Sequence, residues 1–356
     1  MYLARLERLD LSAYKNADNF LQSSFWGEFK ASATWKVLYF DALWYSSVDD
    51  AEDLTFLPLL VLCRSLAAGF GFAYIPWGPI LPDYIAADDK AANAALRELA
   101  CALKTILPAN IAFLRVDPPW FWNEGEPKRN IIKPFIHAHA DIQVPDTVVI
   151  DLMPTTDDIL AQMKPKCRYN VKLGGKKVSV EQCAKQDLPV FYQIFLETAK
   201  RDGIAARGIE YFASLFDLSC KDFDVRLYLA SCKDGENGGK SIPIAGIITI
   251  FYGGIATYLY GASSNICRNL MAPYALQWQA MRDAKECGCR HYDLFGIPPT
   301  DEKNHPMAGL YRFKTGFGGN IIHRPGSQDY PYKTIFTALF RFAESIRKKL
   351  RDRKKR

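Results

Sequence analysis

The chain has 356 residues, a net charge of +6 and 49% hydrophobic residues. This length exceeds that of one ordinary hydrophobic core, so we expect two domains. Residues 242–264 carry no charge over roughly the length that a bilayer needs. Their β-branched and aromatic composition around Gly253-Gly254 nevertheless predicts two strands joined at a glycine turn, which argues against a membrane span.

The cysteines and the amino terminus predict a cytoplasmic protein, and the charge is concentrated at the carboxyl end. Nine cysteines have no disulfide-framework spacing and the amino terminus has no apolar run of signal length, so we expect reduced thiols and a cytoplasmic protein. The last ten residues, RKKLRDRKKR, hold eight bases and one acid, which leaves the rest of the chain nearly neutral. Such a tail is usually a solvated end, although its charge also suits anionic lipid or RNA.

The first half of the chain alternates apolar runs with one long helical pattern. We predict a short helix at residues 25–30 and an alanine-rich helix at residues 87–106. Asp117-Pro118-Pro119 ends the fourth of the five predicted strands. These strands cover residues 35–45, 56–63, 70–75, 147–152 and, before Asp117, 111–116.

The second half begins with a helix at residues 157–163, which Thr155 or Thr156 can cap. A glycine-rich turn at residues 233–240 precedes the charge-free pair of strands. Pro273 fits the first turn of a helix that ends near residue 286. The other predicted elements are strands at residues 178–183, 225–230 and 291–295 and helices at residues 188–201 and 210–220.

The final helix starts at Thr334 and carries an apolar stripe that we expect to dock on a domain. The stripe comprises Ile335, Leu339, Phe342, Ile346 and Leu350.

This order of elements predicts an α+β fold with two GNAT-like domains, each a mixed, mostly antiparallel sheet flanked by helices. We place domain 1 at residues 1–153, completed by residues 322–356, and domain 2 at residues 154–321. The repeat is one of element order and not of residues.

Residues 290–320 contain a candidate functional lysine. A strand ends at Gly296, a polar loop follows, and Lys314 lies between Phe313 and a glycine-rich exit that begins at Gly316. Glycines there allow a close approach of backbone to a ligand. Taken alone, the pattern is that of a strand end with a surface lysine, but such a lysine can also place a charge beside a substrate.

A basic run without any acid follows the helix at residues 157–163. Lys164, Arg168, Lys172 and Lys176 are spaced by four, so one continuous helix would align them on a single face. Gly174-Gly175 weakens the last turn of that helix. A solvated helix face and a nucleic-acid contact are both open at this point.

Motifs in a fixed order carry a family resemblance. They are FLQSSFWGEFK, IPWGPIL, FLRVDPP, MKPKCRYNVK, RDGIAARGIEYF, TYLYGASS, MAPYALQW, HYDLFGIP and GLYRFKTGFGG. Each is weak alone, but together they span most of the chain, and the chain resembles the Fem (FemA/FemB/FemX) aminoacyltransferases. The resemblance implies transfer of an amino acid from aminoacyl-tRNA to an amine of the peptidoglycan stem peptide, with UDP-MurNAc-pentapeptide or lipid II as acceptor.

The chain departs from the larger Fem proteins, which carry a coiled-coil arm in the second domain. Between Arg201 and Tyr211 there is no room for one, so the chain resembles the compact type without an arm. The resemblance implies no cofactor and no metal, and we expect a monomer with peripheral contact between its basic tail and the inner face of the membrane. His137-x-His139 lacks a third metal ligand nearby in the sequence.

The resemblance assigns substrate-binding residues. Lys30 and Arg207 match residues that contact the phosphates of the muramyl precursor, and arginine can do so in a bidentate manner. Tyr260 matches a tyrosine that lines the groove for this precursor. Tyr211, four residues after Arg207, is expected on the same side as Arg207. Period two predicts that Tyr258 points to the same side as Tyr260.

The resemblance also assigns catalytic residues. Lys314 and Phe313 match a pair that holds the aminoacyl ester and the terminal adenosine, where a lysine can stabilise an oxyanion. Asp117 matches a base for the amine proton, against the alternative of a strand-ending cap. For the acceptor stem of the tRNA, the absence of acids in the basic run favours RNA contacts by Lys164, Lys166, Arg168 and Lys172.

Three alternatives stay open. An acyl-CoA N-acyltransferase would need backbone amides at a glycine-rich helix start, but residues 268–273 read RNLMAP, which lacks glycine and loses an amide at Pro273. A protein without catalysis that binds RNA or a membrane surface is the second. A synthase for another lipid-attached polymer is the third.

Overall fold

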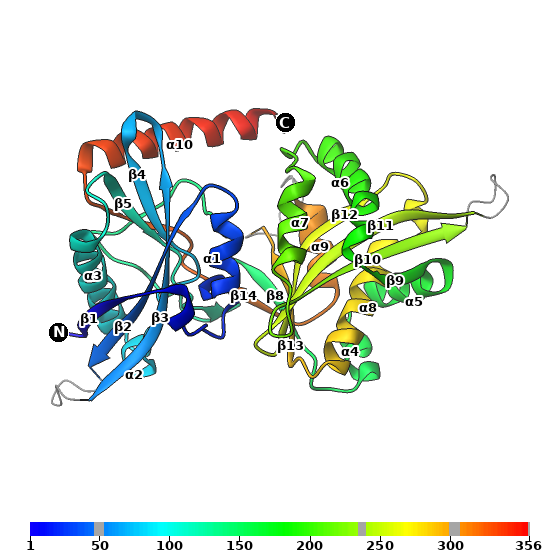
Figure 1. The fold of residues 1–356 in the computed structure, drawn as a ribbon. Helices are drawn as coiled ribbons and strands as arrows, with labels where there is room; N and C mark the ends of the chain where they lie inside the picture. The colour runs from blue at the N-terminus through cyan, green and yellow to red at the C-terminus, as the bar shows by residue number, and fades with distance from the viewer. Residues whose placement is uncertain (46–52, 234–239, 299–306, 355–356) are drawn as a thin grey trace. The chain divides into compact units, whose positions relative to one another are not determined.

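The computed structural model describes residues 1–45, 53–233, 240–298 and 307–354 (Figure 1). The chain forms two compact units: unit 1 comprises Met1–Pro145 and Ile322–Arg356, and unit 2 comprises Asp146–Ile321. Most of the polar loop after Gly296 and of the glycine-rich turn at residues 233–240 lies outside the described residues. Among the described residues, no helix is both long enough and apolar enough to cross a membrane.

The described residues of unit 1 form one sheet, in which β4 and β5 pair in parallel and the other neighbouring strands pair antiparallel. Helix α3 (Asp89–Ile106) connects the two parallel strands. In spatial order the strands are β1 (Leu3–Leu9), β2 (Lys36–Tyr45), β3 (Leu54–Ser65), β4 (Gly71–Ile75), β5 (Ile111–Val116), β15 (Gln328–Pro331) and β7 (Ile136–His137).

The core of unit 1 lies between this sheet and α3. The Asp88 side chain caps α3 by accepting a hydrogen bond from the backbone N–H of Ala91. Leu96, Leu99 and Leu103, at helical spacing, are fully buried against the sheet. The remaining helices are α1 (Ser24–Ala31), α2 (Asp83–Ala86) and α10 (Thr334–Lys354), and β6 (Trp122–Asn123) pairs with the end of β14 (Asn320–His323).

Unit 2 repeats this order of elements. Strands β12 and β13 are parallel and α8 (Ala272–Glu286) connects them, while the other pairs are antiparallel. In spatial order the strands are β8 (Thr147–Asp151), β13 (His291–Gly296), β12 (Ile255–Ser263), β11 (Ser241–Tyr252), β10 (Asp224–Lys233) and β9 (Ser179–Cys183). The predicted α+β fold with two GNAT-like domains is confirmed.

Helices cover both faces of the sheet in unit 2. On one face, α8 and α5 (Pro165–Lys177) enclose a core that includes Ile247 and Tyr292. On the other, α6 (Leu188–Asp202) brings Phe191 so close to Gly246 that a Cβ at this glycine would lie 2.8 Å from the phenylalanine ring. The other helices are α4 (Thr156–Gln162), α7 (Ile209–Asp217) and α9 (Ala308–Gly316), and 3₁₀ turns occur at Leu11–Ala13, Phe20–Gln22, Ala67–Gly69, Lys185–Asp187 and Arg268–Leu270.

Residues 147–151, which the sequence analysis placed in domain 1, belong to unit 2. They form β8, which pairs with β13 at Ile150–Tyr292 and Val149–Asp293. Unit 1 is discontinuous, because residues 322–356 return to it as β15 and α10.

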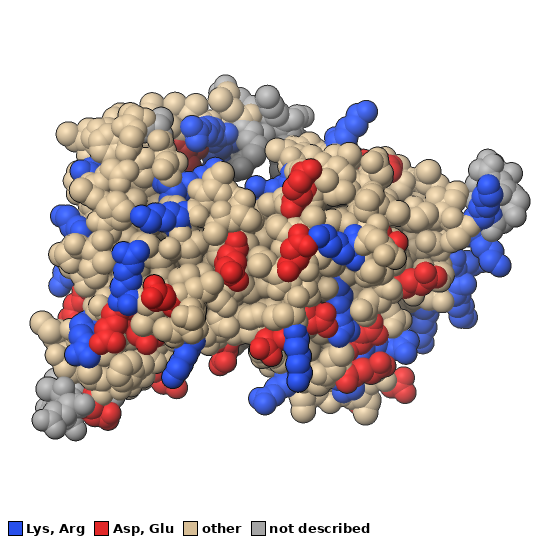
Figure 2. Space-filling model, in the orientation of Figure 1, with Lys and Arg blue, Asp and Glu red and all other residues tan. Residues whose placement is uncertain are grey.

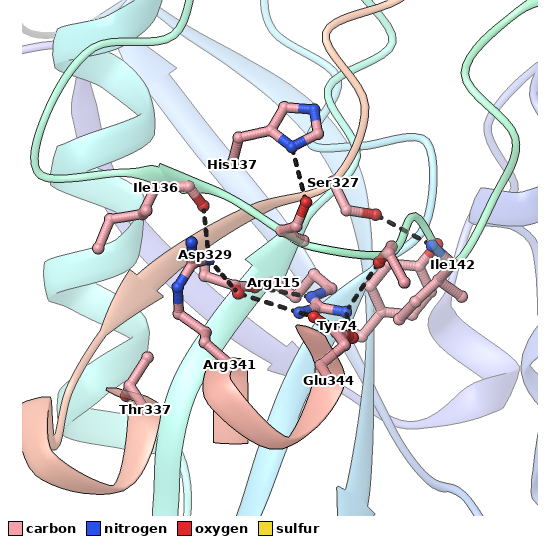
Figure 3. Close-up of polar contacts among 12 residues, drawn as sticks. Tyr74, Arg115, Ile136, His137, Ile142, Ser327, Asp329, Thr337, Arg341 and Glu344 are labelled. Atoms are coloured by element: carbon pink, nitrogen blue, oxygen red, sulfur yellow. Dashed lines mark hydrogen bonds and ion pairs between the residues drawn. The ribbon is translucent and has the colours of Figure 1, made fainter. Parts of the chain in front are cut away.

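A buried ion network fixes this return (Figure 3). The Arg115 side chain on β5 is 2% exposed, and its Nε lies 2.7 Å from Oδ1 of Asp329 on β15. A second arm reaches Oε1 of Glu344 on α10 at 3.0 Å, and Arg341 on α10 also contacts Asp329 at 3.1 Å. Breaking a buried pair leaves an uncompensated charge, so the network joins β5 to chain segments more than two hundred residues later.

The prediction that α10 docks through its apolar stripe is wrong. The helix packs on unit 1 through Thr337, Phe340 and Glu344: the Phe340 ring lies 5.1 Å from that of Phe113, and Thr337 donates a hydrogen bond to the carbonyl of Ala112. The stripe is exposed. The partners that buried Arg115 requires decide which face of the helix points inward.

The predicted continuous basic helix is interrupted. Lys164 is the extended residue before α5, and Pro165 occupies the first turn of that helix. Arg168, Lys172 and Lys176 therefore share a helix, whereas Lys164 lies outside it.

Candidate active site

Lys314 lies in the last turn of α9 and not at a strand end. The interpretation as a surface lysine is wrong, since the residue is 6% exposed. Its Nζ donates hydrogen bonds to the carbonyl oxygens of Gly296 at 2.9 Å and Phe295 at 3.3 Å. The ammonium also lies 5.0 Å from the ring centroid of Tyr258, within the range of a cation–π contact.

The position of Lys314 follows from the way two parallel strands separate. The register of β12 and β13 extends only to Thr257 and Asp293, although both strands continue. Lys314 bonds to the end of β13 and faces Tyr258 on β12, so its ammonium lies where the strands are no longer paired. In open sheets such a point is a usual place for ligands.

Burial lowers the pKa of Lys314 to about 8, and the nearby Asp293 opposes this shift. Near neutral pH the group is therefore charged but close to its titration point. A charge in a site of low dielectric interacts more strongly with a developing anion than it would in water.

Asp293 and Thr147 were not among the site residues predicted from the sequence. Asp293 is 6% exposed; one of its oxygens accepts hydrogen bonds from the Thr147 hydroxyl and, at 2.7 Å, from the backbone N–H of Phe295. These contacts hold the carboxylate beneath the turn that Lys314 contacts. The signal in the sequence was an acid among the aromatic and apolar residues of HYDLFG.

Phe313 lies in an aromatic cluster. Its ring lies 4.9 Å from that of Tyr274 and 5.3 Å from that of Phe317, edge to face in both cases. The cluster anchors α9 against α8, which fixes the backbone that carries Lys314.

A second group of candidate residues lies on the opposite face of the same sheet. The Tyr211 and Tyr260 hydroxyls are 2.9 Å apart, and the guanidinium of Arg207 lies 4.7 Å from the Tyr211 ring centroid. Arg207 is exposed and precedes α7, so the predicted helical spacing to Tyr211 does not apply, although the two side chains meet. Burial raises the pKa values of both tyrosines, which act as neutral hydroxyls.

The prediction that Tyr258 and Tyr260 point the same way is wrong because β12 contains a bulge. Tyr260 pairs with Ile248 and Tyr258 with Thr249, which leaves Leu259 as an extra residue. Neighbouring residues of β11 face opposite sides, so their partners do too. Tyr258 packs in the core on the α8 side, whereas Tyr260 contacts Phe212 of α7 at 5.2 Å between ring centroids.

The basic helix α5 begins beside α9. The Lys164 backbone N–H donates to the carbonyl of Gly316 at 2.9 Å, and a Cβ at Gly316 would lie 3.2 Å from that of Cys167. Lys164, Lys166 and Lys172 are exposed, and Arg168 is half-buried. In Figure 2, lysines and arginines gather along the edge of unit 2 where α5 lies.

A cavity of about 290 Å³ opens between the second half of α5 and α8. Lys172, Trp278 and Arg282 line it together with apolar residues. Two cations and an indole in one recess can hold a base and its phosphate by stacking and charge.

The two candidate residues of unit 1 occupy separate elements. Lys30, half-buried in the last turn of α1, lies 4.1 Å from the Trp26 ring centroid. Asp117 follows β5 and is 4% exposed, and its oxygens accept hydrogen bonds from the hydroxyls of Tyr74 and Ser327. Burial raises the Asp117 pKa to about 7, against the lowering effect of these hydrogen bonds.

The structure thus brings the predicted residues of unit 2 into two groups. Lys314 and Phe313 adjoin the start of the basic helix, whereas Arg207, Tyr211 and Tyr260 form the second group across the sheet. Among the described residues, no cluster of three His, Cys, Asp or Glu side chains could hold a metal ion.

The chain contains two GNAT-like units, and in the second of them a buried lysine lies where two parallel strands separate. These features place it in the class of α+β proteins that contain two such units in tandem. The model of the FemAB family matches residues 7–234 and 228–345. The chain belongs to this family. Six residues connect α6 to α7, so the described chain has no arm between these helices.

Similar proteins agree with this assignment. A lipid II:glycine glycyltransferase of Staphylococcus aureus (strain USA300) is 23% identical over 332 residues, covering 74% of this chain and 78% of that protein. The crystal structure of FemX superposes with a TM-score of 0.72 at 20% identity and covers 93% of this chain and 96% of its own. At this identity, the similarity to FemX shows a shared fold.

Proposed function

We propose that this protein transfers an amino acid from an aminoacyl-tRNA to an amine of the peptidoglycan stem peptide. The observation that carries the proposal is the buried Lys314 ammonium beside the start of a basic helix, in a chain of the FemAB family. A charge for an oxyanion and a surface for a polyanion are what this reaction requires.

The proposed donor lies along α5. Its phosphates contact Lys164, Lys166, Arg168 and Lys172, which follow the backbone without reading sequence. Helix α5 starts against the last turn of α9. An RNA acceptor stem bound along α5 therefore brings its aminoacyl ester to Lys314.

The proposed acceptor is a muramyl pentapeptide, carried by UDP or by lipid. Lys30 and Arg207 contact its phosphates, and the Tyr211 and Tyr260 hydroxyls orient it. The name of the staphylococcal relatives supports lipid II as the carrier. Glycine is a first candidate for the transferred residue on the same ground.

In the proposed reaction, the neutral acceptor amine attacks the ester carbonyl, and Lys314 stabilises the oxyanion. The carbon–oxygen bond to the ribose then breaks, and the ribose oxygen leaves with the proton that the amine releases. Since an ester of tRNA is already activated, orientation and charge supply the catalysis. The proposal gives Asp117 no base role, because the residue is buried and its oxygens accept hydrogen bonds from Tyr74 and Ser327.

One experiment tests the function directly. The purified protein is incubated with charged tRNA pools and either UDP-MurNAc-pentapeptide or lipid II, and the acceptor is analysed by mass spectrometry. We expect the mass of one added amino-acid residue on one acceptor. If neither acceptor gains mass while calorimetry detects CoA binding, the acyl-CoA alternative replaces the proposal.

Variants divide the roles. Lys30→Ala or Arg207→Ala should weaken precursor binding, whereas Lys314→Ala should chiefly lower turnover, by about a hundredfold for the loss of one oxyanion contact. Exposed Lys90→Ala serves as the control. A swap of these effects would refute the role assignment. Full turnover in Lys314→Met would show that the Lys314 charge takes no part in catalysis, whereas the alternative of a protein without catalysis predicts no turnover in the wild type and no measurable change in Lys314→Met.

A further inference from the structure

Helix α10 has two faces, and in the part of the helix whose side chains are described, one of them packs on unit 1. It is 21 residues long, about 32 Å at the usual rise of 1.5 Å per residue. Thr337, Phe340 and Glu344 hold it to β5 through a hydrogen bond, a ring contact and an ion pair. Thr337 is 2% exposed, which shows how closely this face packs.

The opposite face carries the apolar stripe. Consecutive residues of a helix turn by about 100°, so Leu339, two positions after Thr337, points to the far side. The whole stripe is open to solvent in the described structure: Ile335 is 74% exposed, Leu339 59%, Phe342 65%, Ile346 41% and Leu350 54%. Large apolar side chains that line up in this way mark an interaction surface.

The charges on the same helix indicate what covers the stripe. Arg347, Lys348 and Lys349 are exposed, whereas the acid Glu344 is turned inward to Arg115. In the sequence, the last ten residues contain eight bases and one acid. An apolar stripe beside an excess of cations suits an anionic membrane surface, because the acyl chains can bury the stripe. RNA would bind the cations but would leave the stripe exposed.

We propose that α10 lies in the interface of an anionic membrane, with the stripe among the acyl chains and its lysines and arginines at the headgroups. Packing against β5 supports the helix from behind, so the stripe is displayed as a preformed surface. Interfacial helices of this kind lie in the membrane plane and do not cross the bilayer. The proposal extends the peripheral membrane contact expected for the basic tail and names the surface that makes it.

The test is flotation of the full-length protein with vesicles of phosphatidylcholine, with and without phosphatidylglycerol. We expect binding to the anionic vesicles only. The combined variant Leu339→Gln, Phe342→Gln and Ile346→Gln should lose this binding at least about tenfold, since interfacial affinity scales with the buried apolar area. Arg347→Gln, Lys348→Gln and Lys349→Gln together should weaken binding and reduce its dependence on salt.

A matched control removes equally exposed apolar side chains elsewhere. Phe56, Ile132 and Ile266 are 56%, 60% and 58% exposed, and their joint replacement by glutamine should leave flotation unchanged. Flotation needs no tRNA or muramyl peptide, so its failure and a failure of the transferase proposal are separate results.

Four outcomes overturn the proposal. The first is a wild-type protein that does not float with anionic vesicles, and the second is a stripe variant that floats as well as wild-type. A stripe variant that unfolds at a clearly lower temperature than the control variant would mean that protein covers the stripe. A wild-type dimer that the stripe variant converts to monomer would identify a second copy as the occupant.

Discussion

The charge of Lys314 is the residue-scale property with the most direct consequence. Since burial lowers its pKa to about 8, the charged fraction falls as pH rises through that value. Turnover relative to a Lys314→Arg variant should therefore decline from pH 7 to pH 9, because arginine stays charged throughout. The acceptor amine titrates identically in both enzymes, so the ratio isolates Lys314, and a constant ratio would contradict the assignment.

Asp117 gives a second prediction, about stability. Its folded pKa of about 7 exceeds the usual unfolded value near 4. Between these values the folded state binds more protons, so the free energy of unfolding should fall as pH rises, by at most about 4 kcal/mol. In Asp117→Asn this slope should disappear.

Urea unfolding across pH 4 to 8 measures the slope. The variant also separates the two interpretations of Asp117, because turnover should persist near the wild-type level if the residue is structural. A loss of turnover in a variant that is folded and stable would restore the base.

At the scale of elements, the exit from α9 is the most constrained turn near the site. Gly319 has a φ of +79°, and a Cβ there would lie 2.4 Å from the carbonyl oxygen of Val149 on β8. Gly319→Ala should destabilise the protein by roughly 1–3 kcal/mol and displace α9, with a loss of turnover through Lys314.

Gly309 supplies the matched control within the same helix. It is exposed, and a Cβ there would meet nothing within 4 Å. Gly309→Ala should stabilise α9 by about 0.5–1 kcal/mol. Thermal unfolding compares the two, and equal effects would contradict the steric argument.

The sequence predicted those elements whose pattern and packing agree. The helix expected at residues 87–106 is α3, because its alanines and leucines face a sheet as their spacing requires. The strand pair around Gly253-Gly254 forms β11 and β12 for a similar reason. Both features depend on local periodicity, which a single sequence displays.

The errors arose where distant residues decide. The inward face of α10 depends on Arg115, and the orientation of Tyr258 depends on a bulge at Leu259 that leaves the apolar pattern of β12 intact. For Lys314, a short run of aromatics and glycines fits either a strand or a helix. The short strands β7 and β15 gave no signal of their own because few of their residues are apolar.

For the whole molecule, the two units differ in continuity. Residues 146–321 include the strands from β8 to β13 and the core that packs on them, so this fragment should fold alone and unfold cooperatively. Residues 1–145 lack β15 and α10, which leaves Arg115 buried without Asp329 and Glu344. We expect no cooperative transition from that fragment, as judged by circular dichroism during heating.

A peptide of residues 322–356 added to the 1–145 fragment is the control, since it returns the missing strand and helix. Recovery of a cooperative transition would support the argument. Cooperative unfolding of residues 1–145 alone would show that the Arg115 network is dispensable.

The Arg115 network also has a consequence for the order of events on the ribosome. Arg115 leaves the peptidyl-transferase centre 214 residues before Asp329 and 229 before Glu344. At 5–20 residues per second this wait lasts roughly 10–50 s. Unit 1 therefore stays incomplete through most of translation, and unit 2 can fold first. A nascent chain that is truncated near its carboxyl end should lose the fold of unit 1, although most of that unit was synthesised first.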